Sequence, residues 1–251
     1  MIRGLFIGAS GMLVELRRAD LIANNLANAT TTGFKRDDLV AESFGSLLLR
    51  RLDDEVGPGL RPAVAPVVGE LGLGAAGARS AVDWAQGGFT ETGNPLDVAL
   101  DGDGLFAVQT PAGERYTRDG SFTRDRDGYL VTEGGYRVLG ERGAIRLDGA
   151  KVEIASDGAV TIDGRRVDRL RLVQFPAGSL AKLGGNLFAA SGQAGRSQAT
   201  VLQGQLERSN VNVVREMINL IAAQRNYDTN QRLLQLEGDL LQKAVTEVGR
   251  V

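Results

Sequence analysis

Both ends of this chain carry apolar or small residues at helical spacing, and this feature constrains the fold more than any other. Between residues 5 and 26 such residues recur at alternating steps of four and three, which predicts an amphipathic helix with a narrow coiled-coil seam. From about 210 to 247 they recur every seven positions without a proline, which predicts a longer helix of the same kind. The two stripes are Leu5, Ala9, Met12, Leu16, Ala19, Ala23 and Leu26, and then Val213, Leu220, Tyr227, Leu234, Leu241 and Val248.

The middle of the chain has a different pattern. From about 84 to 190, Asp-Gly pairs separate short runs of β-forming residues, such as 105–108, 129–132 and 160–162. Because a two-residue hairpin turn needs positive φ angles, Asp-Gly between such runs indicates antiparallel hairpins. Residues 53–80 are rich in glycine, proline and alanine, and this composition predicts an irregular loop.

The predicted fold class is α+β, with N- and C-terminal coiled-coil-forming helices flanking an inserted antiparallel all-β domain. The predicted segments are a helix in 1–36, an irregular linker in 37–83, a β-rich domain in 84–205 and a helix in 206–251. Both seams are too long to be buried on the β domain. We therefore expect the two helices to pair with each other and with other copies of the chain, and to be poorly ordered in an isolated monomer.

Composition excludes several classes of chemistry. The chain has no cysteine and no histidine, which rules out disulfides, cysteine or histidine metal sites and histidine-based catalytic triads. Its net charge of -2 argues against binding nucleic acid through a basic surface. No run of about 18 apolar residues is present, so we expect no insertion into a membrane, and the start does not match a cleaved secretory signal.

Three motifs suggest chemistry but have simpler explanations. The glycines at 72, 74 and 77 match a dinucleotide fingerprint, yet no convincing strand precedes them. The Asp101-Gly-Asp103 and Asp125-Arg-Asp127 spacings suggest calcium, but Leu105 and Tyr129 stand where oxygen ligands are needed. Paired carboxylates would suit a wall-cleaving glycosidase, although no cleft signature accompanies them. We expect no catalytic residue, no cofactor and no metal.

Asparagines inside the predicted helices need another explanation, because asparagine is a weak helix former. Asn24, Asn25 and Asn28 either lie on a solvated face or bond across helices and fix their register. Ser209, Asn210 and Asn212 are either N-caps of the second helix or part of the same register device.

Several runs resemble the bacterial flagellar rod and hook protein family. The resemblance covers nearly the whole chain, and its motifs stand in the family's order. Within the family, the length and the compact β middle resemble the rod proteins more than the longer hook proteins. The runs at 95–100 and 137–140 then favour a proximal-rod protein, with a distal-rod protein as the alternative. The matching runs are 24–36 (NNLANATTTGFKR), 93–100 (GNPLDVAL), 116–122 (YTRDGSF), 206–217 (LERSNVNVVREM) and 224–230 (QRNYDTN).

This resemblance implies a structural subunit of the basal-body rod and not an enzyme. Such subunits polymerise helically, with the terminal helices forming an inner tube and the β domain an outer layer. The implied partners are other copies, other rod proteins, the hook as a further candidate and the flagellar type III export apparatus, which moves subunits without a cleaved signal peptide. The expected assembly residues are Leu5, Met12, Leu16, Asn24, Asn25, Leu26, Asn28, Ser209, Asn210, Asn212, Met217, Leu220, Tyr227, Leu234 and Leu241.

Overall fold

The computed structural model describes residues 2–50, 67–72, 74–176 and 178–248. The chain divides into two compact units: a helical unit of residues 1–24, 37–81 and 214–251, and a β unit of residues 25–36 and 82–213. Along the chain, one helix precedes and another follows the mainly antiparallel strands, which confirms the predicted α+β class.

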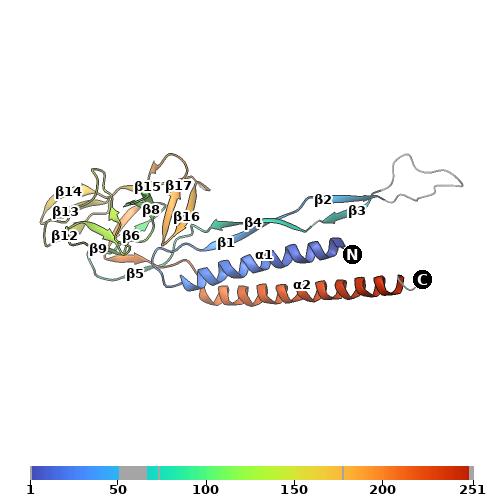
Figure 1. Cartoon of the computed structure of the whole chain (residues 1–251). Coiled ribbons are helices and arrows are strands. Elements are labelled where there is room, and N and C mark those ends of the chain that lie inside the picture. Colours follow the sequence, from blue (N-terminus) through green and yellow to red (C-terminus); the bar gives the residue numbers. More distant parts are fainter. Residues whose placement is uncertain (1, 51–66, 73, 177, 249–251) are drawn as a thin grey trace. The chain divides into compact units, whose positions relative to one another are not determined.

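Two antiparallel helices dominate the helical unit (Figure 1), where α1 spans Ile2–Ala27 and α2 spans Val213–Val248. Glycines of α1 face side chains of α2. A β-carbon added at Gly8 would lie 3.0 Å from Leu234 Cδ2, and one added at Gly11 would lie 3.1 Å from Asn230 Nδ2. Glycine therefore lets the two helices approach closely. The coiled coil itself stays a prediction.

The segment predicted as an irregular linker, 37–83, contains four strands. Strand β1 (Asp37–Ser43) pairs with β4 (Ala75–Val82), and β2 (Ser46–Arg50) pairs antiparallel with β3 (Val67–Gly72). Here the expectation of a loop was wrong, because backbone hydrogen bonds between distant stretches form these ladders without the alternating pattern that marks a half-buried strand. Residues 51–66 of the predicted linker lie outside the described residues.

The β unit holds strands β5 to β20. A large sheet has the order β16-β17-β8-β7-β11-β10-β9, with β15 pairing with β7 and β18. The smaller sheets are β12-β13-β14, β19-β6 and β20-β5. The bounds are β5 (Phe89–Glu91), β6 (Val98–Asp101), β7 (Leu105–Thr110), β8 (Gly113–Thr117), β9 (Phe122–Arg124), β10 (Leu130–Thr132), β11 (Arg137–Val138), β12 (Val152–Ile154), β13 (Ala159–Ile162), β14 (Arg165–Arg169), β15 (Leu172–Gln174), β16 (Leu180–Gly184), β17 (Leu187–Ala190), β18 (Gly195–Arg196), β19 (Thr200–Gln203) and β20 (Gln205–Glu207).

The Asp-Gly hairpin prediction is confirmed most directly between β13 and β14. Asp163 and Gly164 join these two antiparallel strands with φ angles of 49° and 80°. Positive φ at both central residues is the type I′ turn that the dipeptide favours. The Asp-Gly pair at 119–120 does not form the same turn. Gly120 does not have a positive φ angle, and its carbonyl accepts a hydrogen bond from the backbone N–H of Val98 at 3.0 Å.

One apolar core holds the β unit together. Phe106 and Phe122 meet edge to face at its centre, with ring centroids 5.1 Å apart. A smaller cluster of Leu105, Val173 and Phe188 lies beneath Trp84. The main core comprises Val98, Leu100, Phe106, Val108, Phe122, Leu130, Val138, Ile145, Leu147, Ile154, Val160, Ile162, Leu170 and Val201.

Candidate functional site

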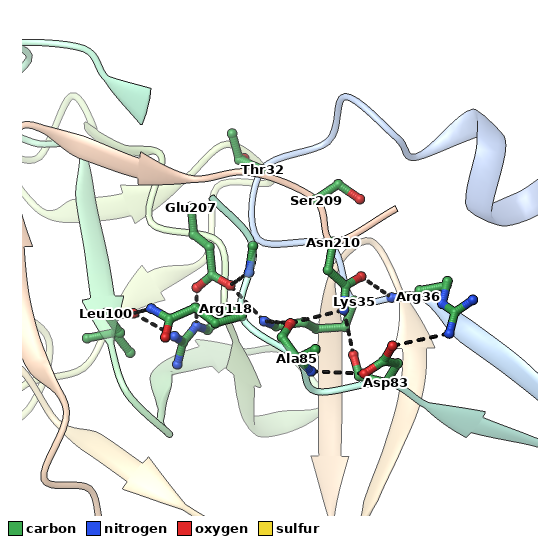
Figure 2. Close-up of polar contacts among 12 residues, drawn as sticks. Thr32, Lys35, Arg36, Asp83, Ala85, Leu100, Arg118, Glu207, Ser209 and Asn210 are labelled. Carbon is green, nitrogen blue, oxygen red and sulfur yellow. Dashed lines mark hydrogen bonds and ion pairs between the residues drawn. The ribbon is translucent and has the colours of Figure 1, made fainter. Parts of the chain in front are cut away.

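Three charged side chains from distant parts of the sequence meet inside the β unit (Figure 2). Lys35 follows α1, Arg118 lies between β8 and β9, and Glu207 ends β20 just before α2. All three are buried. We call these three residues the ion cluster.

The carboxylate of Glu207 is the centre of the ion cluster. Lys35 Nζ donates to Glu207 Oε1 at 2.7 Å, and Arg118 Nε donates to Oε2 at 2.5 Å. The backbone N–H of Gly87 also donates to Oε1, at 2.9 Å. Three donors, two of them charged, therefore satisfy one buried carboxylate, which is the condition under which a buried charge is tolerated.

Both cations also bond to backbone carbonyls. Lys35 Nζ donates to the carbonyl of Ala85 at 2.9 Å. The two terminal nitrogens of Arg118 donate to the carbonyls of Gly104 and Leu100, at 2.5 and 2.6 Å. The ion cluster thus joins four parts of the chain: the segment after α1, the segment after β4 that contains Ala85, the loop before β7 that contains Gly104, and the end of β20.

Two glycines allow the backbone to close around the cluster. The N–H of Gly33 donates to the carbonyl of Glu207 at 2.8 Å, and its φ angle is 63°. A β-carbon at Gly33 would lie 2.6 Å from the carbonyl carbon of Arg118, and one at Gly87 would lie 1.9 Å from the carbonyl oxygen of Arg208. No side chain fits at either position unless the backbone moves.

A second polar layer lies beside the ion cluster (Figure 2) and contains Asn210. The Oδ1 of Asn210 accepts from the backbone N–H of Arg36 at 2.8 Å. Its Nδ2 donates to the carbonyls of Asp83 and Ala85, at 2.8 and 3.0 Å. The Arg36 guanidinium lies 3.2 Å from Asp83 Oδ2. Asn210 therefore links the same chain segments as Glu207.

The electrostatics keep the carboxyl of the cluster ionised. Burial alone would raise the pKa of Glu207, but the charge of Arg118, the Lys35 hydrogen bond and the Gly87 N–H together lower it. Burial also lowers the pKa of Lys35 and outweighs the hydrogen bond and charge of Glu207, which act in the opposite direction. The arrangement suits a fixed structural link, in which removing one partner would leave a buried charge uncompensated.

The expected assembly residues fall into three groups by exposure. Asn25 is buried, at 1% exposure. Leu16 and Met217, by contrast, are about half exposed, at 50% and 51%, and Asn24 and Asn212 are also exposed. The half-buried ones are Leu5, Met12, Leu26, Asn28, Ser209, Asn210, Leu220, Tyr227, Leu234 and Leu241.

The helices carry large apolar side chains that are exposed, and most of them were not among the expected assembly residues. On α1, Phe6 and Leu13 are exposed and stand one heptad apart. On α2, exposed apolar residues also recur at helical spacing. We call the two sets together the exposed helix faces: Phe6, Leu13 and Leu16 on α1, and Val214, Met217, Ile218, Ile221, Leu233, Leu236, Leu240 and Val245 on α2.

Sequence reasoning missed the ion cluster. Lys35, Arg118 and Glu207 each lie in a run that carries the family resemblance, at 24–36, 116–122 and 206–217. The only sign of the cluster in the sequence was the presence of a lysine, an arginine and a glutamate in three separate motifs. Nothing in the spacing of these residues, however, indicates that they touch.

The described part of the chain offers little for other chemistry. It contains no group of three or more histidine, cysteine, aspartate or glutamate side chains placed to hold a metal ion. Within the same residues, neither helix has the combination of length and apolar character that crossing a membrane requires.

Three family descriptions match the chain. "Flagella basal body rod protein" matches residues 5–35, "Flagellar hook protein FlgE/F/G D1 domain" matches 99–162, and "Flagellar basal body rod FlgEFG protein C-terminal" matches 202–247. One member of the ion cluster lies in each matched range. The contacts of the cluster therefore join all three regions.

Curated relatives match over almost the full length. The chain is 35% identical to a flagellar basal-body rod protein FlgF of Caulobacter vibrioides over 258 residues, which covers 100% of both chains. It is 34% identical to a flagellar basal-body rod protein FlgG of Buchnera aphidicola, covering 97% of this chain and 98% of the relative. For FlgG of Bacillus subtilis the identity is 32%, with 98% of each chain covered.

Proposed function

The chain belongs to the flagellar basal-body rod protein family, and we propose that it assembles into the rod through the exposed helix faces. Membership makes it a structural subunit of the basal-body rod and not an enzyme. The glycosidase and nucleotide-binding alternatives are therefore set aside. What the family leaves open is which residues join one subunit to the next.

The single observation that carries the proposal is the set of apolar side chains left in water on both helices. Leu13, Ile218 and Leu236 are 61%, 62% and 59% exposed, respectively. Burying a side chain of this size contributes about 1.5–3 kcal/mol. Repeated along two helices, this is enough to hold subunits together without covalent links, and a contact that does not close on itself generates a filament.

The residues selected from the seven-residue pattern remain part of the proposal. Leu16 and Met217 belong to the exposed helix faces, and half-buried members such as Leu220 and Tyr227 flank them along α2. We propose that Asn24, Asn28 and Asn212 fix the register between subunits, since amide side chains at an apolar interface specify alignment. Asn210 also has a local role through its bonds within the β unit.

Within the rod we favour the proximal position, with the distal position as the alternative. Support for the proximal position comes from the runs at 95–100 and 137–140. The relatives carry both names, FlgF and FlgG, at nearly equal identity. Electron microscopy of basal bodies from cells that lack this chain distinguishes the two. A proximal subunit leaves the rod truncated near its inner end, whereas a distal subunit leaves a longer stub.

We propose further that the chain leaves the cell through the flagellar type III apparatus without a cleaved signal peptide. This rests on membership of the family. The test is the N-terminal sequence of the chain recovered from purified basal bodies. An N-terminus that begins at or next to Met1 supports the proposal, and one that begins after a removed leader contradicts it.

A further inference from the structure

The β unit contains a pocket of about 490 Å³ next to the ion cluster. This volume lies within the range of about 300–1,000 Å³ typical of pockets that hold ligands. Its walls combine apolar side chains, which include Trp84, Leu105, Phe175 and Leu180, with polar ones, which include Lys35 and Arg118. All of its lining residues belong to the β unit.

Both cations line the pocket, and their hydrogen bonds within the chain do not use all of their N–H donors. Lys35 has three N–H donors and makes two hydrogen bonds within the described part of the chain, to Glu207 and Ala85. Arg118 has five N–H donors and makes three, to Glu207, Gly104 and Leu100. One ammonium hydrogen and two guanidinium hydrogens are therefore left for an acceptor.

We propose that this pocket binds an acidic side chain flanked by large apolar residues, presented by a peptide segment of another protein chain. A carboxylate suits the remaining N–H donors because it accepts several hydrogen bonds. It would also add a second negative charge, since the positive charges of Lys35 and Arg118 face only the single carboxylate of Glu207. The apolar walls match the flanking residues. The pocket shares no residue with the exposed helix faces. An experiment can therefore refute this binding proposal without refuting the proposed assembly through the helices.

Asp103 also lines the pocket and is exposed. Its negative charge opposes the binding of a second carboxylate near the mouth. Removing that charge is therefore expected to strengthen binding of an acidic ligand. The proposal thus predicts a variant with higher affinity and not only variants with lower affinity. In the described part of the chain, the Asp103 side chain forms no hydrogen bond or ion pair with Lys35, Arg118 or Glu207, so its replacement leaves the bonds of that cluster in place.

The experiment uses the full chain and the emission of Trp84, its only tryptophan. The probes are the peptide acetyl-Leu-Glu-Phe-amide and its neutral counterpart acetyl-Leu-Gln-Phe-amide. We expect a saturable change in Trp84 emission with the glutamate peptide and at least tenfold weaker binding of the glutamine peptide. Asp103→Asn should bind the glutamate peptide several-fold more tightly. Glu133→Gln, an exposed acidic residue that does not line the pocket, should bind it as the wild type does.

Two results would overturn the proposal. One is equal affinity of the two peptides, or no binding of either at a concentration of about 1 mM, because a carboxylate site must discriminate charge. The other is an equal change in affinity for the glutamate peptide in Asp103→Asn and Glu133→Gln, which would show that only the net charge of the chain affects binding.

Discussion

Lys35 Nζ lies 2.7 Å from Glu207 Oε1 although 172 residues separate the two in the sequence. Both side chains are 2% exposed. The first residue belongs to the segment that leaves α1 and the second to the segment that leads into α2. The ion pair therefore makes the segments adjoining both terminal helices part of the folded β unit.

The first prediction concerns the centre of this cluster. Glu207→Gln keeps the shape of the side chain but removes the counter-charge of Lys35 and Arg118. Breaking a buried pair in this way costs about 3–5 kcal/mol, because a charge is left uncompensated. Denaturant unfolding followed by Trp84 fluorescence measures the loss of free energy of unfolding.

Glu153→Gln is the matched control. Glu153 also pairs with a lysine, Lys151, at 2.6 Å, but both side chains are more than half exposed. Exposed pairs contribute about 0–1 kcal/mol. Equal losses of stability in Glu153→Gln and Glu207→Gln would contradict the role given to the ion cluster.

The second prediction concerns acid. The folded chain has a lowered pKa at Glu207, where burial is outweighed by Arg118 together with the Lys35 and Gly87 hydrogen bonds. The unfolded chain therefore takes up this proton at a higher pH than the folded chain. The stability that Glu207 contributes is fully present above the unfolded pKa and is lost as the pH falls through the folded pKa.

Unfolding curves from neutral pH into the acid range test this linkage. The difference in stability between the wild type and Glu207→Gln should be constant near neutral pH and should shrink as the solution becomes acidic. A difference that stays constant down to the acid limit would mean that Glu207 has the same pKa in the folded and unfolded chains, which contradicts the lowered pKa.

The third prediction compares two adjacent glycines. A β-carbon at Gly87 would lie 1.9 Å from the backbone oxygen of Arg208, whereas one at Gly88 would meet nothing within 4 Å. Gly87→Ala must displace the backbone beside Glu207 and should destabilise the β unit by at least about 2 kcal/mol. Gly88→Ala should change the free energy of unfolding by less than about 1 kcal/mol. Thermal melts of both variants make the comparison, and equal melting temperatures would refute the tight approach.

Much of the fold could be predicted because local patterns encode it. Seven-residue periodicity located both helices, and Asp-Gly pairs marked hairpins such as the one at Asp163 and Gly164. The strands between residues 37 and 82 escaped prediction, because pairing such as that of β1 with β4 joins stretches far apart in the sequence.

The candidate site was predicted less well than the fold. Periodicity identifies a helix face but does not say which neighbour covers it. In α1 the glycines Gly8 and Gly11 face Leu234 and Asn230 of α2. The ion cluster depends on contacts across 89 and 172 residues, which no local pattern encodes. Asn210 was expected to cap α2 or set register, and its bonds to Arg36, Asp83 and Ala85 became visible only in three dimensions.

The central claim is that the exposed helix faces join one subunit to the next. Leu236 and its neighbour Gln235 are both exposed on α2, so they form a matched pair. Leu236→Asp places a charge where an apolar contact is proposed, and Gln235→Asp places the same charge one residue away. Both variants are expressed in cells that lack the natural chain, and a melt of each purified variant checks that the β unit is folded.

The deciding measurement is the amount of each variant recovered in purified basal bodies, together with swimming motility. We predict that Leu236→Asp is incorporated at least tenfold less than the natural chain and abolishes motility, whereas Gln235→Asp is incorporated and supports swimming. Normal rods and normal swimming with Leu236→Asp would contradict assembly through the exposed helix faces.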